Sequence, residues 1–156
     1  MLVLLMTSCG FHLRGAYQLP ESMAKTYIQA GNQNSDLIRS LKRSLKVNNI
    51  LLIEDKTQAS AILTISSEMR NKRILSVDSR GRAREYELSY KVSFDVQDKS
   101  SNFIVTRQSL KLEREFLFDT EDILGKGREE STLIKDMQQD MVRLILLRLQ
   151  SVSHER

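Results

Sequence analysis

The sequence predicts an α+β fold: a two-layer sandwich in which a mixed, mostly antiparallel four-stranded sheet carries two helices packed on one face. Three long stretches alternate apolar and polar residues, as strands with one dry and one wet face do. Two other stretches repeat their apolar residues at helical spacing. A chain of 156 residues suits one domain with one core, and we assign that domain to residues 9–156.

The first strand and the first helix are short. Residues 24–30 include Thr, Tyr and Ile and stop at a glycine, which predicts a strand. Asn34 or Ser35 can cap the helix that follows, and the asparagines at 48–49 end it, since they tolerate a left-handed backbone. Residues 50–53 form either a small strand or a packed connection, and the strand–helix–strand crossover makes part of the sheet parallel. The predicted buried face of the helix is Leu37, Ile38, Leu41 and Leu45. The opposite face is basic, and it is either a solvated surface or a surface for a partner: Arg39, Lys42, Arg43 and Lys46.

Three long antiparallel strands are expected next, at residues 61–77, 84–98 and 103–118. The second has the cleanest pattern, because its alternate residues form one continuous apolar face. That face is Tyr86, Leu88, Tyr90, Val92, Phe94 and Val96. Gly81 and its polar neighbours supply the first turn, and polar residues at 98–102 supply the second. Because both strands around Gly81 are long, the first hairpin is expected to protrude beyond the core.

The last helix carries the second helical pattern. Residues 119–127 are expected to form a loop, because Gly125 and Gly127 lie there, and the helix is expected to run from near Glu129 to about Gln150. Its buried face is predicted to be Leu133, Ile134, Met137, Met141, Leu144 and Ile145. The methionines in this stripe fit core packing better than a binding groove.

The composition favours a binding protein over an enzyme. The chain has two histidines, His12 and His154, and neither has a cysteine or carboxylate at metal-ligand spacing. It also lacks a serine-elbow motif, a P-loop and a dinucleotide-binding glycine motif. We therefore expect no enzymatic activity, no cofactor and no bound metal. A net charge of +4 and a pI of about 9.3 favour anionic partners.

Basic charge gathers in the first hairpin. From Glu68 to Arg84 the only acids are Glu68 and Asp78, whereas the bases are Arg70, Lys72, Arg73, Arg80, Arg82 and Arg84. Guanidinium forks at a hairpin tip suit phosphate groups; alternatively, these charges protect a sheet edge from unwanted pairing. We expect no nucleic-acid partner, since the nearby tyrosines belong to the buried face and offer no stacking platform.

The first nine residues resemble the end of a bacterial lipoprotein signal. An apolar run is followed by two small polar residues and then by Cys9, the only cysteine of the chain. Residues 1–8 are then a partial signal peptide, and the Cys9 thiol is the site of lipidation. The alternative is a buried strand at residues 2–6 with Cys9 as a core thiol. No run of about 20 apolar residues is present, so no transmembrane span is expected.

Three motifs resemble the family of the LPS-assembly lipoprotein LptE. Residues 9–15 (CGFHLRG) are similar to the start of the mature family members, in which a glycine, an aromatic residue, His, Leu and Arg follow the cysteine. Residues 84–88 (REYEL), which follow Gly81, and residues 133–137 (LIKDM) add support. The resemblance spans almost all of residues 9–156, so we expect a single LptE-like domain.

The resemblance implies an outer-membrane lipoprotein anchored in the periplasmic leaflet, with no enzymatic role. Members of this family plug the β-barrel of LptD, assist its assembly, bind lipopolysaccharide (LPS) and help to place it in the outer leaflet. Their LPS contacts involve a basic residue near the hairpin glycine and one in the loop before the last helix. By motif alignment the first falls on Ser79 or Arg80, of which we choose Arg80, and the second falls on Lys126. The charge of the hairpin adds Arg82 to these candidates. The alternative is a generic periplasmic lipoprotein that scaffolds another envelope complex without touching LPS.

Overall fold

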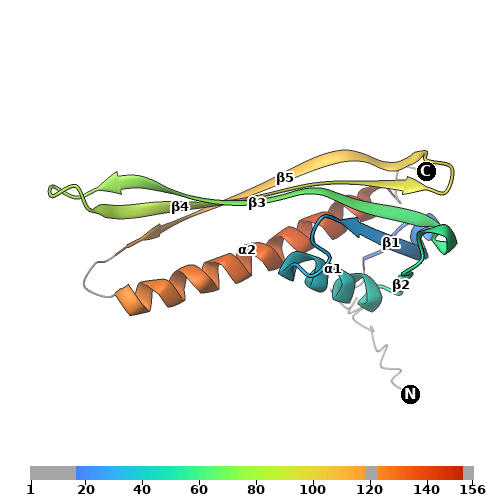
Figure 1. The fold of residues 1–156 in the computed structure, drawn as a ribbon, viewed down its shortest axis with the longest axis horizontal. Helices are drawn as coiled ribbons and strands as arrows, with labels where there is room; N and C mark the ends of the chain where they lie inside the picture. Colours follow the sequence, from blue (N-terminus) through green and yellow to red (C-terminus); the bar gives the residue numbers. More distant parts are fainter. Residues whose placement is uncertain (1–16, 119–122, 153–156) are drawn as a thin grey trace, which may run out of the picture.

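The computed structural model describes residues 17–118 and 123–152. It contains a five-stranded mixed sheet in the order β2-β1-β3-β4-β5, with both long helices on one face (Figure 1). The predicted two-layer α+β sandwich is therefore confirmed, with one more strand than expected. The extra strand is β2 (Leu51–Leu52), which pairs in parallel with β1 (Lys25–Ala30). So short an apolar run cannot be assigned from periodicity, because two residues do not establish an alternation.

The predicted crossover places α1 (Asp36–Val47) between two parallel strands. β1 pairs in parallel with β3 (Ala61–Val77), and α1 connects β1 to β2. Ser35 caps the helix, since its Oγ accepts a hydrogen bond from the Ile38 amide at 3.3 Å. Asn49 ends it with a left-handed backbone, φ 61°, as predicted. Short 3₁₀ turns at Glu21–Met23 and Lys56–Gln58 precede β1 and β3.

Three long strands form most of the sheet. β4 (Ala83–Asp98) pairs antiparallel with β3 on one side and with β5 (Phe103–Leu117) on the other. Near α1 the helix-facing side chains are fully buried, as at Leu63, Phe94 and Val96. A register shift between Ile65 and Ser67 marks the end of this packed half. Beyond it, residues 67–93 and 109–117 extend past α1, and we call these residues the arm (Figure 1).

The last helix, α2 (Ile123–Ser151), runs beneath the arm and continues beneath the packed half of the sheet (Figure 1). The helix begins at Ile123, so the loop predicted at residues 119–127 is wrong over its second half. The two glycines cost the helix about 1 kcal/mol each relative to alanine, and packing of α2 against the arm overrides that preference. Met137 and Met141 are buried, which agrees with their predicted role in the core.

Candidate functional site

The tip of the β3–β4 hairpin is a rigid turn built around Asp78. The Asp78 amide donates to the carbonyl of Arg82 at 2.8 Å, and the Gly81 amide donates to the carbonyl of Asp78 at 2.9 Å. The Asp78 carboxylate accepts two further backbone hydrogen bonds, from Arg80 at 2.8 Å and from Arg82 at 2.9 Å. Gly81 has φ 76°, a conformation that glycine adopts without strain. The backbone that carries the predicted arginines is therefore fixed.

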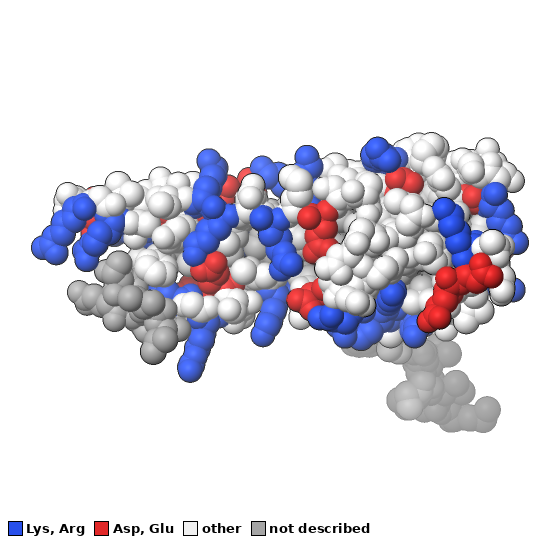
Figure 2. Space-filling view, viewed as in Figure 1, with Lys and Arg blue, Asp and Glu red and all other residues white. Residues whose placement is uncertain are grey.

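The arginines at this tip differ in their pairing. Arg82 is held by Asp78, with Nε at 2.8 Å and Nη2 at 2.7 Å from the carboxylate. The hydrogen bond from the Arg82 amide, reinforced by the Arg82 side chain, lowers the pKa of the Asp78 carboxyl below its usual value. In the described part of the chain, the side chains of Arg80 and Arg84 have no hydrogen-bond or ion-pair partner. Figure 2 shows basic side chains gathered at the end of the arm, on the left of the view.

A cavity of about 450 Å³ lies between the tip and the start of α2. Its polar lining is Asp78, Arg82, Arg84 and Lys126, and its apolar lining is Ala83, Leu117 and Phe118. The structure thus brings Arg82 and Lys126 to one site, whereas Arg80 lies on the turn outside the lining. Lys126 lies in α2 and not in the predicted loop, and its Nζ pairs with Glu129 at 2.7 Å.

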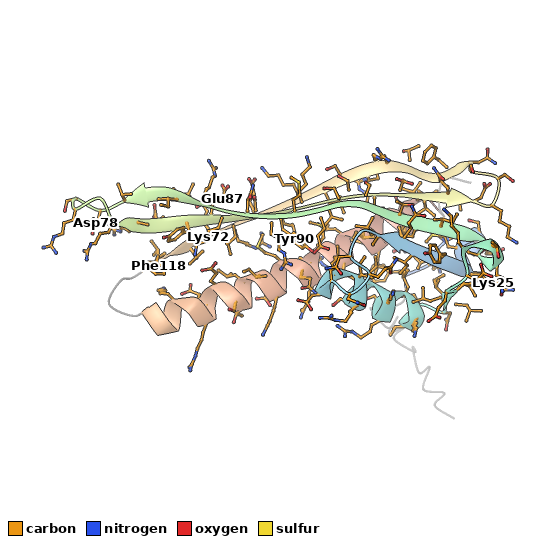
Figure 3. The ribbon with its side chains drawn as sticks, viewed as in Figure 1. Lys25, Lys72, Asp78, Glu87, Tyr90 and Phe118 are labelled. Atoms are coloured by element: carbon orange, nitrogen blue, oxygen red, sulfur yellow. The ribbon has the colours of Figure 1, made fainter. Side chains whose placement is uncertain are left out.

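Lys72 connects the arm to α2 at this end of the molecule. Its ammonium lies 4.2 Å from the ring centroid of Tyr86 and also faces Phe116 and Phe118. Figure 3 labels Lys72 and Phe118 between the arm and α2. The same Nζ is 2.5 Å from a carboxylate oxygen of Glu130 on α2. The Tyr86 and Phe116 rings stack at 5.6 Å, and Phe118 meets Tyr86 edge-on at 5.5 Å. Sequence reasoning counted Lys72 only as hairpin charge, because nothing in the pattern reveals which rings surround it.

Arg114 makes a second link between the arm and α2. In the sequence it interrupts the apolar face of the third long strand. In the structure its Nη2 lies 3.1 Å from a carboxylate oxygen of Asp140 on α2, and both side chains are partly exposed. The charged residue that interrupts the apolar pattern therefore forms an ion pair between the sheet and the helix layer. It adds a polar contact where the helix lies under the outer strand.

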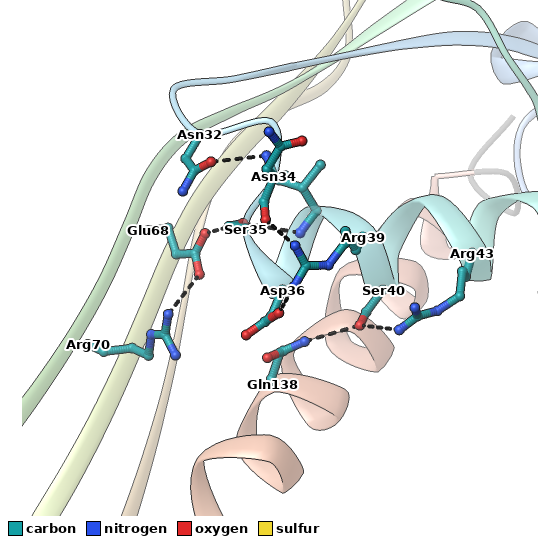
Figure 4. Close-up of polar contacts among 11 residues, drawn as sticks. Asn32, Asn34, Ser35, Asp36, Arg39, Ser40, Arg43, Glu68, Arg70 and Gln138 are labelled. Carbon is teal, nitrogen blue, oxygen red and sulfur yellow. Dashed lines mark hydrogen bonds and ion pairs between the residues drawn. The ribbon is translucent and has the colours of Figure 1, made fainter. Parts of the chain in front are cut away.

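Glu68 links α1 to the base of the arm. One carboxylate oxygen accepts from the Tyr90 hydroxyl at 2.8 Å. The other accepts from the Ser35 hydroxyl at 2.9 Å (Figure 4). Burial, with help from the hydrogen bond to Glu68, raises the pKa of Tyr90. Arg70 covers the Tyr90 ring, with its guanidinium carbon 5.7 Å from the centroid. This cluster is fully paired within the protein, and we assign it a structural role.

Two negative findings concern the described residues alone. Across residues 17–118 and 123–152, no group of three His, Cys, Asp or Glu side chains is arranged to hold a metal ion. No helix in these same ranges combines the length and the apolarity needed to cross a membrane. Cys9, His12 and His154 lie outside the described residues, so the structure does not place the predicted lipidation site.

The fold is that of a class of small bacterial lipoprotein domains. The uncharacterized lipoprotein B of Nitrosomonas europaea, solved by NMR, has a TM-score of 0.78 at 32% identity, with 93% of each chain covered. The crystal structure of the rare lipoprotein B of Shewanella oneidensis has a TM-score of 0.73, covers 84% of this chain and 97% of that one, and is 23% identical. The second of these likenesses concerns the fold alone.

The family model LptE, described as lipopolysaccharide-assembly, matches residues 23–149, and the chain belongs to this family. Among similar proteins, the LPS-assembly lipoprotein LptE of Photorhabdus laumondii is 28% identical over 150 residues, with 96% of this chain and 81% of the relative covered. Its counterpart in Yersinia enterocolitica is 25% identical, with 93% and 72% covered. The resemblance drawn from the sequence motifs is confirmed.

Proposed function

We propose that this protein is an outer-membrane lipoprotein of LPS assembly, which plugs and helps to assemble an LptD-like β-barrel and binds LPS. In this proposal Cys9 is the lipid-anchored N-terminus on the periplasmic side of the outer membrane, after removal of residues 1–8. Membership of the LptE family supports the assignment to LPS assembly. The names of the similar proteins, LPS-assembly lipoproteins, support both the process and the anchor.

The cavity at the tip is the observation that carries the LPS-binding part of the proposal. It sets the cations of Arg82, Arg84 and Lys126 beside the apolar surface of Leu117 and Phe118. LPS presents phosphates directly above acyl chains, so a site that joins guanidinium groups to an apolar wall fits both of its parts. Guanidinium forks hold phosphate oxygens through paired, charge-assisted hydrogen bonds.

The pairing of the cations suggests how the site acts. Within the described residues the side chains of Arg80 and Arg84 have no partner to exchange before they meet a phosphate. Arg82 and Lys126 are each held by a carboxylate of this chain, Asp78 and Glu129, and these contacts orient the two cations toward the cavity. Phosphates that reach this tip exchange contacts with neighbouring LPS molecules for contacts with the protein, which loosens packed LPS and orients it.

Reversal of the charge at the tip tests the proposal. The variant Arg80→Glu/Arg82→Glu/Lys126→Glu is expected to lose at least tenfold in affinity for purified LPS, because three attractive contacts become repulsive. Its matched control, Lys46→Glu/Lys91→Glu/Lys99→Glu, changes net charge equally at exposed positions outside the cavity lining. Equal affinity of both variants for LPS would refute a specific site at the tip.

Co-purification tests the partner and the anchor. The protein extracted from membranes in mild detergent is expected to carry a heat-modifiable β-barrel protein and bound LPS. Intact-mass analysis of the same sample is expected to show Cys9 as the acylated first residue. A preparation with neither barrel nor LPS would favour a scaffold for another envelope complex.

A further inference from the structure

The end of the arm exposes large aliphatic side chains. Ile74, Val77 and Leu117 keep 55%, 56% and 55% of their surface exposed, and Leu75 keeps 37%. Ile74, Leu75 and Val77 lie just before the tip turn, and Leu117 lies on β5 opposite Glu85. We call these four residues the apolar band. A sheet with one wet face normally carries polar side chains at such positions. Exposed apolar surface of this kind marks a site of interaction.

The apolar band lies on both faces of the arm. Ile74 is paired with Tyr86 on the face that looks toward α2. Leu117 follows the buried Phe116 and so alternates to the opposite face of β5, but β5 is the edge strand, and Leu117 still contributes to the lining of the cavity at the tip. Register shifts between Ile74 and Val77 change the alternation just before the turn. Flexible hydrocarbon chains reach both faces of such a hairpin at once.

Charge next to the band favours an anionic amphiphile as the occupant. Residues 74–84 contain three arginines and one acid, Asp78, whose carboxylate is already occupied by the turn. The turn is held by backbone hydrogen bonds, so the backbone positions that carry the arginines and the aliphatic residues are fixed relative to one another. An amphiphile with phosphates joined to acyl chains fits this arrangement, because its phosphates would meet the cationic tip and its acyl chains the apolar band.

We propose that the apolar band takes up acyl chains of the same LPS molecule whose phosphates meet Arg80, Arg82 and Lys126. This inference rests on the proposed function for the identity of the lipid, and it extends the hydrocarbon contact from the cavity wall to Ile74, Leu75 and Val77 on β3. The tip then recognises the junction between phosphates and acyl chains. It discriminates acylated LPS from other phosphorylated sugars.

The test removes aliphatic surface without removing charge. The variant Ile74→Thr/Val77→Thr/Leu117→Thr introduces β-branched residues that suit strands at three exposed positions, so the fold is expected to persist. Its matched control, Val47→Thr/Leu51→Thr/Phe103→Thr, changes exposed apolar residues outside the band, at 77%, 56% and 52% exposure. The probes are intact LPS and fully deacylated LPS, which share phosphates and sugars.

Wild-type protein and the control are expected to bind intact LPS more tightly than deacylated LPS. The band variant is expected to lose on the order of tenfold in affinity for intact LPS and little for deacylated LPS. The reason is that about half of the surface of each replaced side chain is exposed in the free protein, and acyl chains would bury it on binding. Circular dichroism and urea unfolding check the fold, and the single change Leu117→Thr replaces the triple variant if the triple variant unfolds.

Three results would overturn the inference. In the first, the band variant binds intact LPS with wild-type affinity while the charge-reversed tip variant loses binding. This result rules out the acyl contact but leaves the proposed function standing. Wild-type protein that binds neither probe overturns both. Sedimentation velocity tests the other occupant: self-association that the band variant abolishes, with LPS affinity unchanged, assigns the band to a second copy of the chain.

Discussion

Replacement of Lys72 by methionine tests how α2 is held against the arm. Methionine keeps most of the apolar stem but removes the ammonium from the ring of Tyr86 and from Glu130. The cation–π contact, at 4.2 Å and partly desolvated, contributes about 1 kcal/mol. The ion pair, whose two side chains are 34% and 25% exposed, contributes about 0.5–1 kcal/mol. Methionine is more apolar than lysine, so its burial at this position offsets about 0.5 kcal/mol of the combined loss.

The expected net loss for Lys72→Met is therefore about 1–1.5 kcal/mol, which lowers the melting temperature by about 3–5 °C in a domain of this size. Urea unfolding followed by far-UV circular dichroism measures it. A double-mutant cycle with Glu130→Gln isolates the ion pair, and we expect a coupling of about 0.5–1 kcal/mol that shrinks in high salt. An unfolding free energy unchanged within about 0.3 kcal/mol, or a coupling near zero, would refute the reasoning.

Two further predictions concern the hairpin turns. The pKa of Asp78 is lowered below its usual 3.8 by the amide of Arg82, so the stabilisation of the tip is present above that value and is lost as pH falls through the lower folded-state pKa. NMR titration of the Arg82 amide is expected to give a midpoint below 3.8, absent in Asp78→Asn; a midpoint at or above 3.8 contradicts the assignment. Ser101 has φ 65° in the second hairpin, where Asp98 accepts hydrogen bonds from the turn as Asp78 does in the first. Glycine adopts such a positive φ without strain, so Ser101→Gly is expected to stabilise the protein by about 0.5 kcal/mol. For the same reason Gly81→Ala is expected to destabilise it by about 1 kcal/mol. Urea unfolding decides the signs, and a loss of stability in Ser101→Gly would count against the argument.

Patterns that repeat along the chain predicted most of the fold. The alternation of residues 84–98 and the spacing of Leu37, Leu41 and Leu45 identify the faces that the structure buries. The sequence does not predict the start of α2, because glycine preference is a local signal, whereas the contacts that hold the first turns are with strands distant in sequence. It does not decide whether β2 is a strand, because two residues carry no period.

The candidate site was predictable as a concentration of charge but not as a geometry. Arg80 and Arg82 stand out in the sequence because acids are scarce around them, and Gly81 identifies their turn. The ion pair between Asp78 and Arg82 depends on the geometry of the turn. The position of Lys126 in the same cavity depends on how the hairpin and α2 pack together. The apolar band could not be found from sequence, because exposure depends on where α1 and α2 end.

The length of the arm relative to α1 has a consequence for how the protein opens. Near α1 the sheet shares a core with two helices, in which Leu41, Phe94 and Ile145 have no exposed surface. Along the arm only α2 covers the sheet, and polar contacts such as that of Lys72 with Glu130 contribute to the attachment. We therefore expect the free energy of local opening to fall toward the tip, and the arm and the first turns of α2 to open before the packed half. Under the proposed function, an LPS molecule with more acyl chains would widen this end while the packed half remained folded.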